Sequence, residues 1–250
     1  MLAKWAKTWY TFGKKTGESM NFLFDLYGTL LDIHTEEDGR DFWERIATIL
    51  GEPLASHTAI EQEYHALCAA HCTDAGKEFD LLAVFAQMVK THAAPMDAGA
   101  LAHAFRMASM KKLCLFPHVK EMLADLRAVG AGVYLVSNAQ ACFTHRELSD
   151  SGLTPYFDGI LLSSEAGWKK PAPQIFEVAS GRFGIDLSDA IYVGNDLRDD
   201  VLGATRVGMP SVYIHTPQSG CYEGMPQPTY VAEDHAELRT LLHSLAKGKK

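Results

Sequence analysis

Short apolar segments alternate with helix-length segments along most of this chain, and this alternation constrains the fold more than any other feature. The predicted strands are 21–25, 133–136, 159–162, 190–193 and 211–214. One predicted helix ends at Val129 and a second lies near Arg146. Two more span Gln174–Phe183 and Val201–Val207, and the last follows Asp234. Strands that alternate with helices through short loops favour an α/β fold with a doubly wound parallel sheet.

The alternation is interrupted after the first strand by a long segment that has helical periodicity only. From Thr35 to about Lys112 apolar residues recur at helical spacing, and no strand is predicted there. We therefore predict a core domain formed by residues 20–33 and 113–250, with a helical cap domain at residues 34–112.

Residues 1–19 are predicted to form an N-terminal extension, which is either a surface helix or a segment upstream of a natural start at Met20. They lack the continuous apolar region and small-residue cleavage site of a secretory signal. No apolar run approaches the roughly 20 residues that cross a bilayer, so no transmembrane segment is predicted.

The composition indicates a cytoplasmic protein with no nucleic-acid or membrane partner. The formal net charge of −8 argues against a general attraction to nucleic acid or to anionic membranes. The five cysteines are scattered, which fits reduced thiols better than a disulfide framework. The sequence leaves open whether the protein is a monomer or a homodimer.

Polar residues stand at or just beyond the carboxyl ends of four predicted strands. They are Asp25, then Ser137 and Asn138, then Lys170, and finally Asn195, Asp196, Asp199 and Asp200. Each group alone could be a helix cap, a turn or a solvated side chain. Because ligands bind at the carboxyl ends of parallel strands, all four groups together predict one active-site crevice.

Four segments resemble, in order and spacing, the motifs of the haloacid dehalogenase-like hydrolases. They are FDLYGTL (24–30), LVSNA (135–139), GWKKPAPQIF (167–176) and YVGNDLRDDVLGA (192–204). The resemblance spans about Asn21 to Ile214, and it implies the Rossmann-like core and helical cap of that family.

This resemblance implies covalent catalysis by Asp25, which would attack phosphorus or a halogen-bearing carbon to form an acyl phosphate or an ester. The implied catalytic partners are Thr29, Ser137 and Lys170. The amide of Asn138 and the backbone N–H groups of the Tyr27–Gly28 turn are the expected substrate contacts. The implied cofactor is Mg²⁺, with oxygen ligands from Asp25, the backbone carbonyl of Tyr27, Asp196, Asn195 and Asp200.

Tyr27 is one departure from the family pattern, because phosphatases of the family usually have a second aspartate there that acts as general acid and base. A phenol with a reference pKa near 10 is poorly matched to that role at neutral pH. With Tyr27, the segment DLYGT instead resembles the first motif of the 2-haloacid dehalogenases. Those enzymes use no metal and bind the substrate carboxylate or halide through a cap arginine. Arg40, Arg45 and Arg106 lie in the predicted cap, but none matches that position by its spacing.

The fourth motif is the other departure, because Asn195 stands where many members have the first metal-binding aspartate. The spacing from Asp196 to Asp200 fits a family variant, so Asp196 is the favoured ligand, with Asn195 or Asp200 assisting. Such a dense acidic cluster would repel itself without a cation. We therefore expect Mg²⁺-dependent hydrolysis of a small phosphorylated metabolite. The alternatives are metal-independent dehalogenation and a weakly active member that binds another protein.

Overall fold

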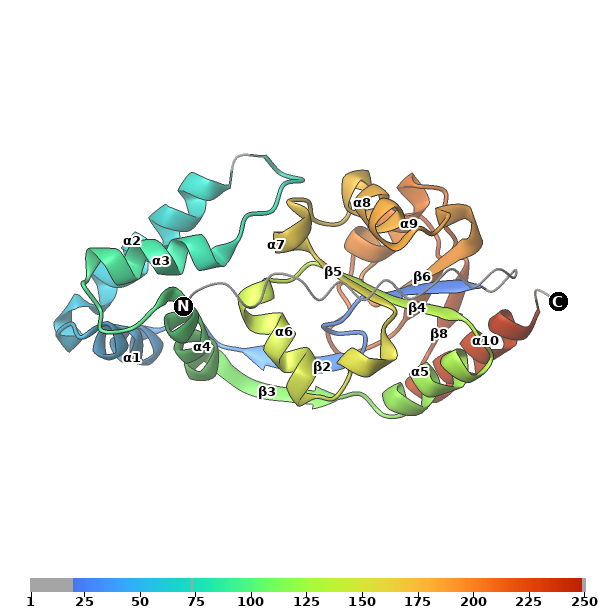
Figure 1. Cartoon of the computed structure of the whole chain (residues 1–250), viewed down its shortest axis with the longest axis horizontal. Helices are drawn as coiled ribbons and strands as arrows, with labels where there is room; N and C mark the ends of the chain where they lie inside the picture. Colours follow the sequence, from blue (N-terminus) through green and yellow to red (C-terminus); the bar gives the residue numbers. More distant parts are fainter. Residues whose placement is uncertain (1–19, 73, 249–250) are drawn as a thin grey trace.

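The computed structural model describes residues 20–72 and 74–248, so the extension predicted for residues 1–19 lies outside the described part (Figure 1). A six-stranded parallel sheet has the order β5-β4-β1-β6-β7-β8. Its strands are β1 (Asn21–Phe24), β4 (Gly132–Ser137), β5 (Gly159–Leu162), β6 (Ala190–Gly194), β7 (Ser211–Ile214) and β8 (Tyr230–Ala232). The predicted α/β fold with a parallel sheet is confirmed, although the short β8 was not predicted.

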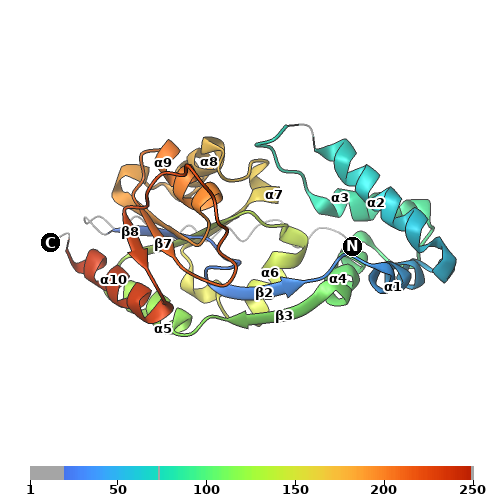
Figure 2. The same cartoon turned by 180° about the vertical axis from the view of Figure 1, so that it is seen from behind.

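Helices cover both faces of this sheet, as Figures 1 and 2 show. The core helices are α5 (Val119–Ala128), α6 (Ala141–Asp150), α7 (Ser163–Ala166), α8 (Pro173–Phe183), α9 (Leu202–Arg206) and α10 (His235–Lys247). Shorter helical turns are η1 (Leu54–Ser56), η2 (Thr154–Tyr156), η3 (Leu187–Asp189) and the π-turn η4 (Leu197–Val201). Phe22 and Phe24 of β1 pack with α5 and α10, whereas Leu23 packs with α8. This alternation follows from the two-residue period of a strand and gives the sheet two apolar layers.

An antiparallel ribbon connects the sheet to a separate group of helices. Its strands are β2 (Leu31–Thr35) and β3 (Met110–Leu115), and Leu31 pairs with Leu115 where the ribbon leaves the sheet. The prediction that residues from Thr35 to Lys112 contain helices and no strand was therefore wrong at both ends. The lysines at 111 and 112 are exposed on the ribbon, so β3 lacks the continuous apolar character that marks the buried strands.

Four helices beyond the ribbon have a hydrophobic core of their own. They are α1 (Arg40–Leu50), α2 (His57–His71), α3 (Leu81–Thr91) and α4 (Ala98–Ser109). Trp43, Phe85 and Phe105 are fully or almost fully buried at their centre. At the edge of this core, the His92 ring lies between Glu52 and Glu63, at 2.8 and 2.7 Å from their carboxylate oxygens.

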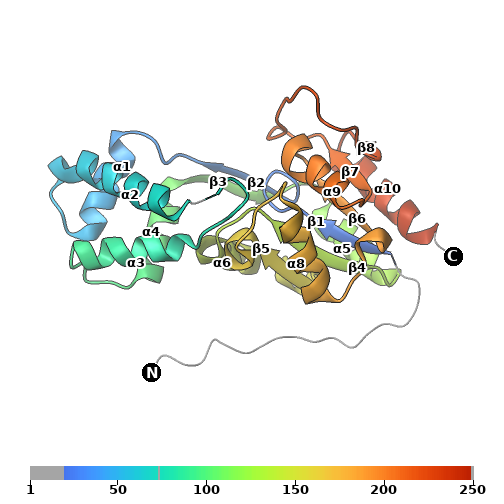
Figure 3. The same ribbon diagram turned by 90° about the horizontal axis from the view of Figure 1, so that it is seen from above.

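The helical group also contacts the sheet domain away from the ribbon. Figure 3 shows these helices to one side of the sheet, with β2 and β3 leading to them. The loop between α2 and α3 reaches the segment before Lys170, where the Lys169 N–H donates to the Gly76 carbonyl at 3.0 Å and the Glu78 N–H donates to the Gly167 carbonyl at 3.1 Å. Within the described residues, no helix combines the length and apolar character needed to cross a membrane.

Candidate active site

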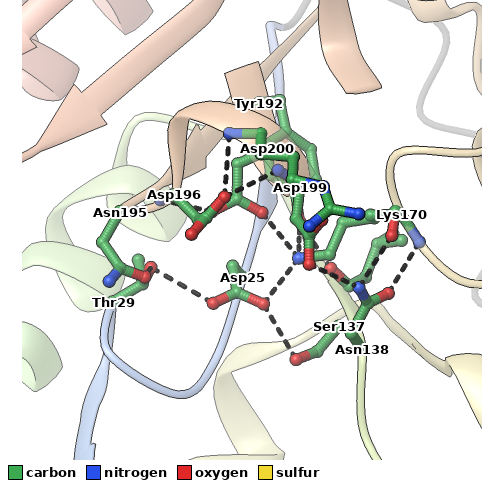
Figure 4. Close-up of polar contacts among 12 residues, drawn as sticks. Asp25, Thr29, Ser137, Asn138, Lys170, Tyr192, Asn195, Asp196, Asp199 and Asp200 are labelled. Atoms are coloured by element: carbon green, nitrogen blue, oxygen red, sulfur yellow. Dashed lines mark hydrogen bonds and ion pairs between the residues drawn. The ribbon is translucent and has the colours of Figure 1, made fainter. Parts of the chain in front are cut away.

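Asp25 directly follows β1, and its N–H donates to the Val193 carbonyl of the neighbouring strand at 2.9 Å. Its side chain is almost completely buried. One carboxylate oxygen, Oδ1, accepts from Lys170 Nζ at 2.6 Å and from Ser137 Oγ at 2.9 Å. The other oxygen, Oδ2, lies 3.3 Å from Thr29 Oγ1 (Figure 4). The structure thus brings together all four side chains that the sequence indicated as catalytic.

Lys170 is a buried cation held between two carboxylates. Its Nζ contacts Asp200 Oδ1 at 2.7 Å as well as Asp25, and it donates to the Tyr192 hydroxyl at 2.7 Å. Burial alone would lower the pKa of Lys170, but the carboxylates of Asp200 and Asp25 outweigh it and raise the pKa well above its usual value. Lys170 therefore keeps a fixed positive charge beside the oxygen of Asp25.

Asn138 holds the backbone of Lys170 from two sides. Its Oδ1 accepts from the Lys170 N–H at 2.7 Å, and its Nδ2 donates to the Lys170 carbonyl and to Asp199 Oδ2, each at 3.0 Å. Because the amide is used in this way, its geometry fits the positioning of Lys170 rather than the expected contact with substrate. Burial raises the pKa of Asp199, the other residue that the amide contacts.

Thr29 connects Asp25 with Asn195. The Thr29 hydroxyl, whose single proton is within reach of both, lies 3.1 Å from Asn195 Oδ1. Gly28 packs against the same amide: its φ is +81°, and a Cβ at this position would lie 2.6 Å from Asn195 Nδ2. The Gly28 N–H donates to the Leu31 carbonyl at 2.8 Å, so the expected anion-binding nest at the turn does not include it.

Asp196 and Asp200, two of the three carboxylates in the acidic cluster, are placed differently. Asp200 is 1% exposed, with one oxygen on Lys170 and the other accepting the Asp196 N–H at 2.9 Å, and burial raises its pKa. Asp196 lies nearer the surface, where Oδ1 caps η4 and Oδ2 accepts from the Tyr222 hydroxyl at 3.0 Å. Asp200 is thus the counter-ion of Lys170, and Asp196 is the more accessible carboxylate.

The donor atoms of this crevice fit a hard cation. Among residues 20–72 and 74–248, no set of three or more His, Cys, Asp and Glu side chains is arranged as a metal site. Hard cations also accept amide oxygens, and Asn195 supplies one near the carboxylates of Asp25 and Asp196 (Figure 4). The backbone carbonyl of Tyr27, two residues after Asp25, is the further ligand expected from the sequence. The carboxylates outnumber the single buried ammonium of Lys170, so a divalent cation would balance the charge.

The Tyr27 side chain belongs to a buried network between the sheet domain and the helical group. Its hydroxyl donates to Glu147 of α6 in a very short hydrogen bond and lies 2.8 Å from Thr144 Oγ1. Glu147 also accepts from Arg106 Nε of α4 at 2.6 Å. Burial, followed by the charge of Glu147, raises the pKa of Tyr27, so the phenol stays neutral and its proton is committed to Glu147.

Several side chains that shape the site carry no recognisable sequence signal. Tyr192 lies inside β6, where alternate apolar residues predict only a strand, and its hydroxyl donates to the Val136 carbonyl at 2.6 Å while supporting Lys170. Glu147 and Arg106 come from different helices 41 residues apart. Only tertiary structure pairs them, because neither has a partner at helical spacing.

Comparison with known proteins identifies the family. Residues 20–208 match the family of haloacid dehalogenase-like hydrolases. The chain is 36% identical over 118 residues to the ribulose-1,5-bisphosphate 5-phosphatase of Halopiger xanaduensis, covering 47% of this chain and 49% of that protein. It is 33% identical over 101 residues to the glyceraldehyde 3-phosphate phosphatase of Methanothermobacter thermautotrophicus, covering 40% and 45%. The chain thus spans about half the length of these curated relatives.

Solved structures share the fold at low sequence identity. A phosphatase of the same family from Thermococcus onnurineus superposes with a TM-score of 0.59 and 21% identity, covering 89% of this chain and 97% of that one. The L-2-haloacid dehalogenase of Xanthobacter autotrophicus gives a TM-score of 0.57 and 18% identity, covering 93% and 100%. Because a phosphatase and a dehalogenase superpose equally well, the fold alone does not separate the two reactions.

Proposed function

The chain belongs to the haloacid dehalogenase-like hydrolases, and we propose that it hydrolyses a small phosphorylated metabolite through an aspartyl-phosphate on Asp25. The observation that carries this proposal is the convergence of Lys170, Ser137 and Thr29 on the buried Asp25 carboxylate. A carboxylate is a weak nucleophile toward an anionic phosphate, so it needs this surrounding set of positive charge and hydrogen-bond donors.

Two displacements at phosphorus complete the reaction. An oxygen of Asp25 forms a bond to phosphorus while the bond to the leaving group breaks, and the leaving group departs with the electron pair. Water then attacks the phosphorus and gives up a proton to solvent, the bond to Asp25 breaks, and phosphate is released with the carboxylate restored. The leaving group takes up a proton from solvent, so the overall proton count balances. Lys170, Ser137 and Thr29 donate to the oxygens that carry negative charge in both steps.

Magnesium is the cofactor that we propose for this site. Asp25, Asp196, the Tyr27 backbone carbonyl and the Asn195 amide oxygen would hold it, whereas Asp200 serves as the counter-ion of Lys170. When bound, Mg²⁺ would offset the repulsion between the anionic nucleophile and the anionic substrate. The neutral amide of Asn195 contributes one less negative charge than an aspartate would, and Asp196 next to it supplies a carboxylate.

The names of the relatives support a phosphorylated substrate over a halogenated one. The matched curated proteins include phosphatases named for ribulose-1,5-bisphosphate, glyceraldehyde 3-phosphate and phosphoserine. Tyr27 favours dehalogenation as the second candidate, because a halide leaves without protonation. Its hydroxyl, which donates to Glu147, is not available to protonate a leaving group.

The proposal is tested by Mg²⁺-dependent phosphate release from a panel of sugar phosphates, phosphoserine and acetyl phosphate. The Asp25→Asn variant should lose turnover, and a chelator should abolish the activity of the unaltered chain. Asp150→Asn is the matched control, because this carboxylate is exposed on α6. Halide release from 2-chloropropionate without metal, and no phosphate release, would replace the proposal with dehalogenation. No release in either assay would favour a protein-binding role.

A further inference from the structure

The Thr29 backbone is held by a histidine from the far end of the chain. His235, the first residue of α10, contacts the Thr29 carbonyl with Nε2 at 2.8 Å. Both residues are buried, and the His235 ring stacks on Phe116 with the ring centroids 4.5 Å apart. A carbonyl oxygen can only accept a hydrogen bond, so Nε2 carries the proton. Burial lowers the pKa of His235, which keeps the ring neutral at neutral pH.

A second residue from the same part of the chain supports the partner of Thr29. Thr216, which follows β7, accepts from Asn195 Nδ2 at 3.3 Å through its hydroxyl. This contact orients the Asn195 amide with Oδ1 toward Thr29. Both supports lie beyond residue 208, where the match to the family ends. The C-terminal segment therefore supports the active site from behind the catalytic turn.

We propose that His235 is a positioning residue: its Nε2–H group holds the Thr29 carbonyl and so keeps the Thr29 hydroxyl between Asp25 and Asn195. A backbone carbonyl and the side chain of the same residue move together when the local backbone rotates. Loss of the His235 donor leaves the buried carbonyl without this bond, and the turn relaxes to satisfy it. The hydroxyl then leaves the position from which it can donate to the reacting oxygens.

The effect on turnover rests on the function proposed above, and acetyl phosphate is the probe. His235→Phe keeps the aromatic stack on Phe116 but lacks the donor, so kcat should fall about tenfold or more, while KM changes less than about twofold. His235→Gln places an N–H at a similar reach and should retain most of kcat. His243→Gln on the same helix is the control, and it should leave kcat unchanged.

A double-variant cycle separates positioning from general stability. If His235 acts through the Thr29 hydroxyl, His235→Phe should lower kcat by less than about twofold in a Thr29→Val background. A purely structural role would give the same loss in both backgrounds, which would overturn the proposal. His235 also lines a cavity of about 400 Å³ with Phe116, His118, His215 and Thr216. Imidazole should therefore enter this space and restore kcat in His235→Ala, but not in His235→Ala/Thr29→Val.

A structural measurement decides the proposal even if the chain hydrolyses none of the phosphate compounds. In a crystal structure of the His235→Phe variant, the distance from Thr29 Oγ1 to Asn195 Oδ1 should increase clearly from 3.1 Å. If this variant does not fold, the same distance is measured in His235→Ala with and without imidazole. An unchanged distance in the variant would overturn the positioning role, whereas failure of Asp25→Asn to abolish activity would overturn only the proposed function.

Discussion

The ion pair between Arg106 of α4 and Glu147 of α6 is a buried charged contact between the helical group and the sheet domain. The two side chains are 12% and 6% exposed, so solvent screens them little. Removing one partner of a buried pair leaves a buried charge without compensation and costs about 3–5 kcal/mol. The amide of Glu147→Gln keeps one acceptor oxygen where Glu147 uses two, one for Tyr27 and one for Arg106 Nε, so one of these bonds remains. We therefore expect a loss near the lower end of this range, about 3 kcal/mol in the free energy of unfolding.

Urea denaturation monitored by circular dichroism measures this loss, provided that the fluorescence and ellipticity transitions coincide. The control is Asp150→Asn on the same helix, because its pair with Arg146 is 63% and 66% exposed and should contribute less than about 1 kcal/mol. Arg106→Gln should cost a similar amount to Glu147→Gln, and the double variant should cost much less than their sum. A loss below about 1 kcal/mol, or additive losses, would refute the buried-pair reasoning.

Three further results are expected. Gly28→Ala should destabilise the chain and lower kcat more than Gly130→Ala, because both glycines have a φ above +80° but only Gly28 has a side chain within 4 Å of the added Cβ. Equal effects of the two variants on unfolding and on kcat would contradict the steric argument. His92→Gln should destabilise the chain most below about pH 6.5, because the two glutamates outweigh burial and raise the pKa of His92. The loss of stability should shrink as the pH rises through that raised pKa, and a loss that grows with pH in urea titrations would contradict this reasoning. Turnover of aryl phosphates should fall steeply as the pKa of the leaving phenol rises, and Tyr27→Phe should leave this dependence unchanged, because the Tyr27 hydroxyl donates to Glu147. A steeper dependence in Tyr27→Phe would show that the Tyr27 phenol acts as the general acid.

The sheet could be predicted from the sequence because its strands are buried on both faces. Strands such as β5 and β7 were predicted at their observed bounds, since apolar runs between loops mark a parallel sheet. The ribbon strand β3 was missed because its lysines face solvent. The strand β8 is three residues long, with Tyr230 and Val231 exposed, and so carries too little pattern to detect.

The residues of the site likewise differ in how well the sequence predicts them. Polar residues at the ends of strands could be found because the sheet topology brings those ends together, as it does for Asp25, Ser137 and Lys170. Contacts that depend on how helices pack against the sheet leave no local signal. His235 is an ordinary first-turn residue of a helix in the sequence, and only the packing of α10 places it against the turn that contains Thr29.

The ribbon also bears on how such a chain can change over evolutionary time. Because Leu31 and Leu115 are paired, the chain leaves the sheet and returns to it at neighbouring points. An insertion with a different length or helix number could therefore replace this one without any change in strand order. A replacement would still need its own loop to meet the backbone at Lys169, since Gly76 makes that contact next to Lys170. The helical group could thus change in length and in number of helices while the sheet that carries Asp25 keeps its strand order, with the contact between Gly76 and Lys169 as one constraint on the replacement.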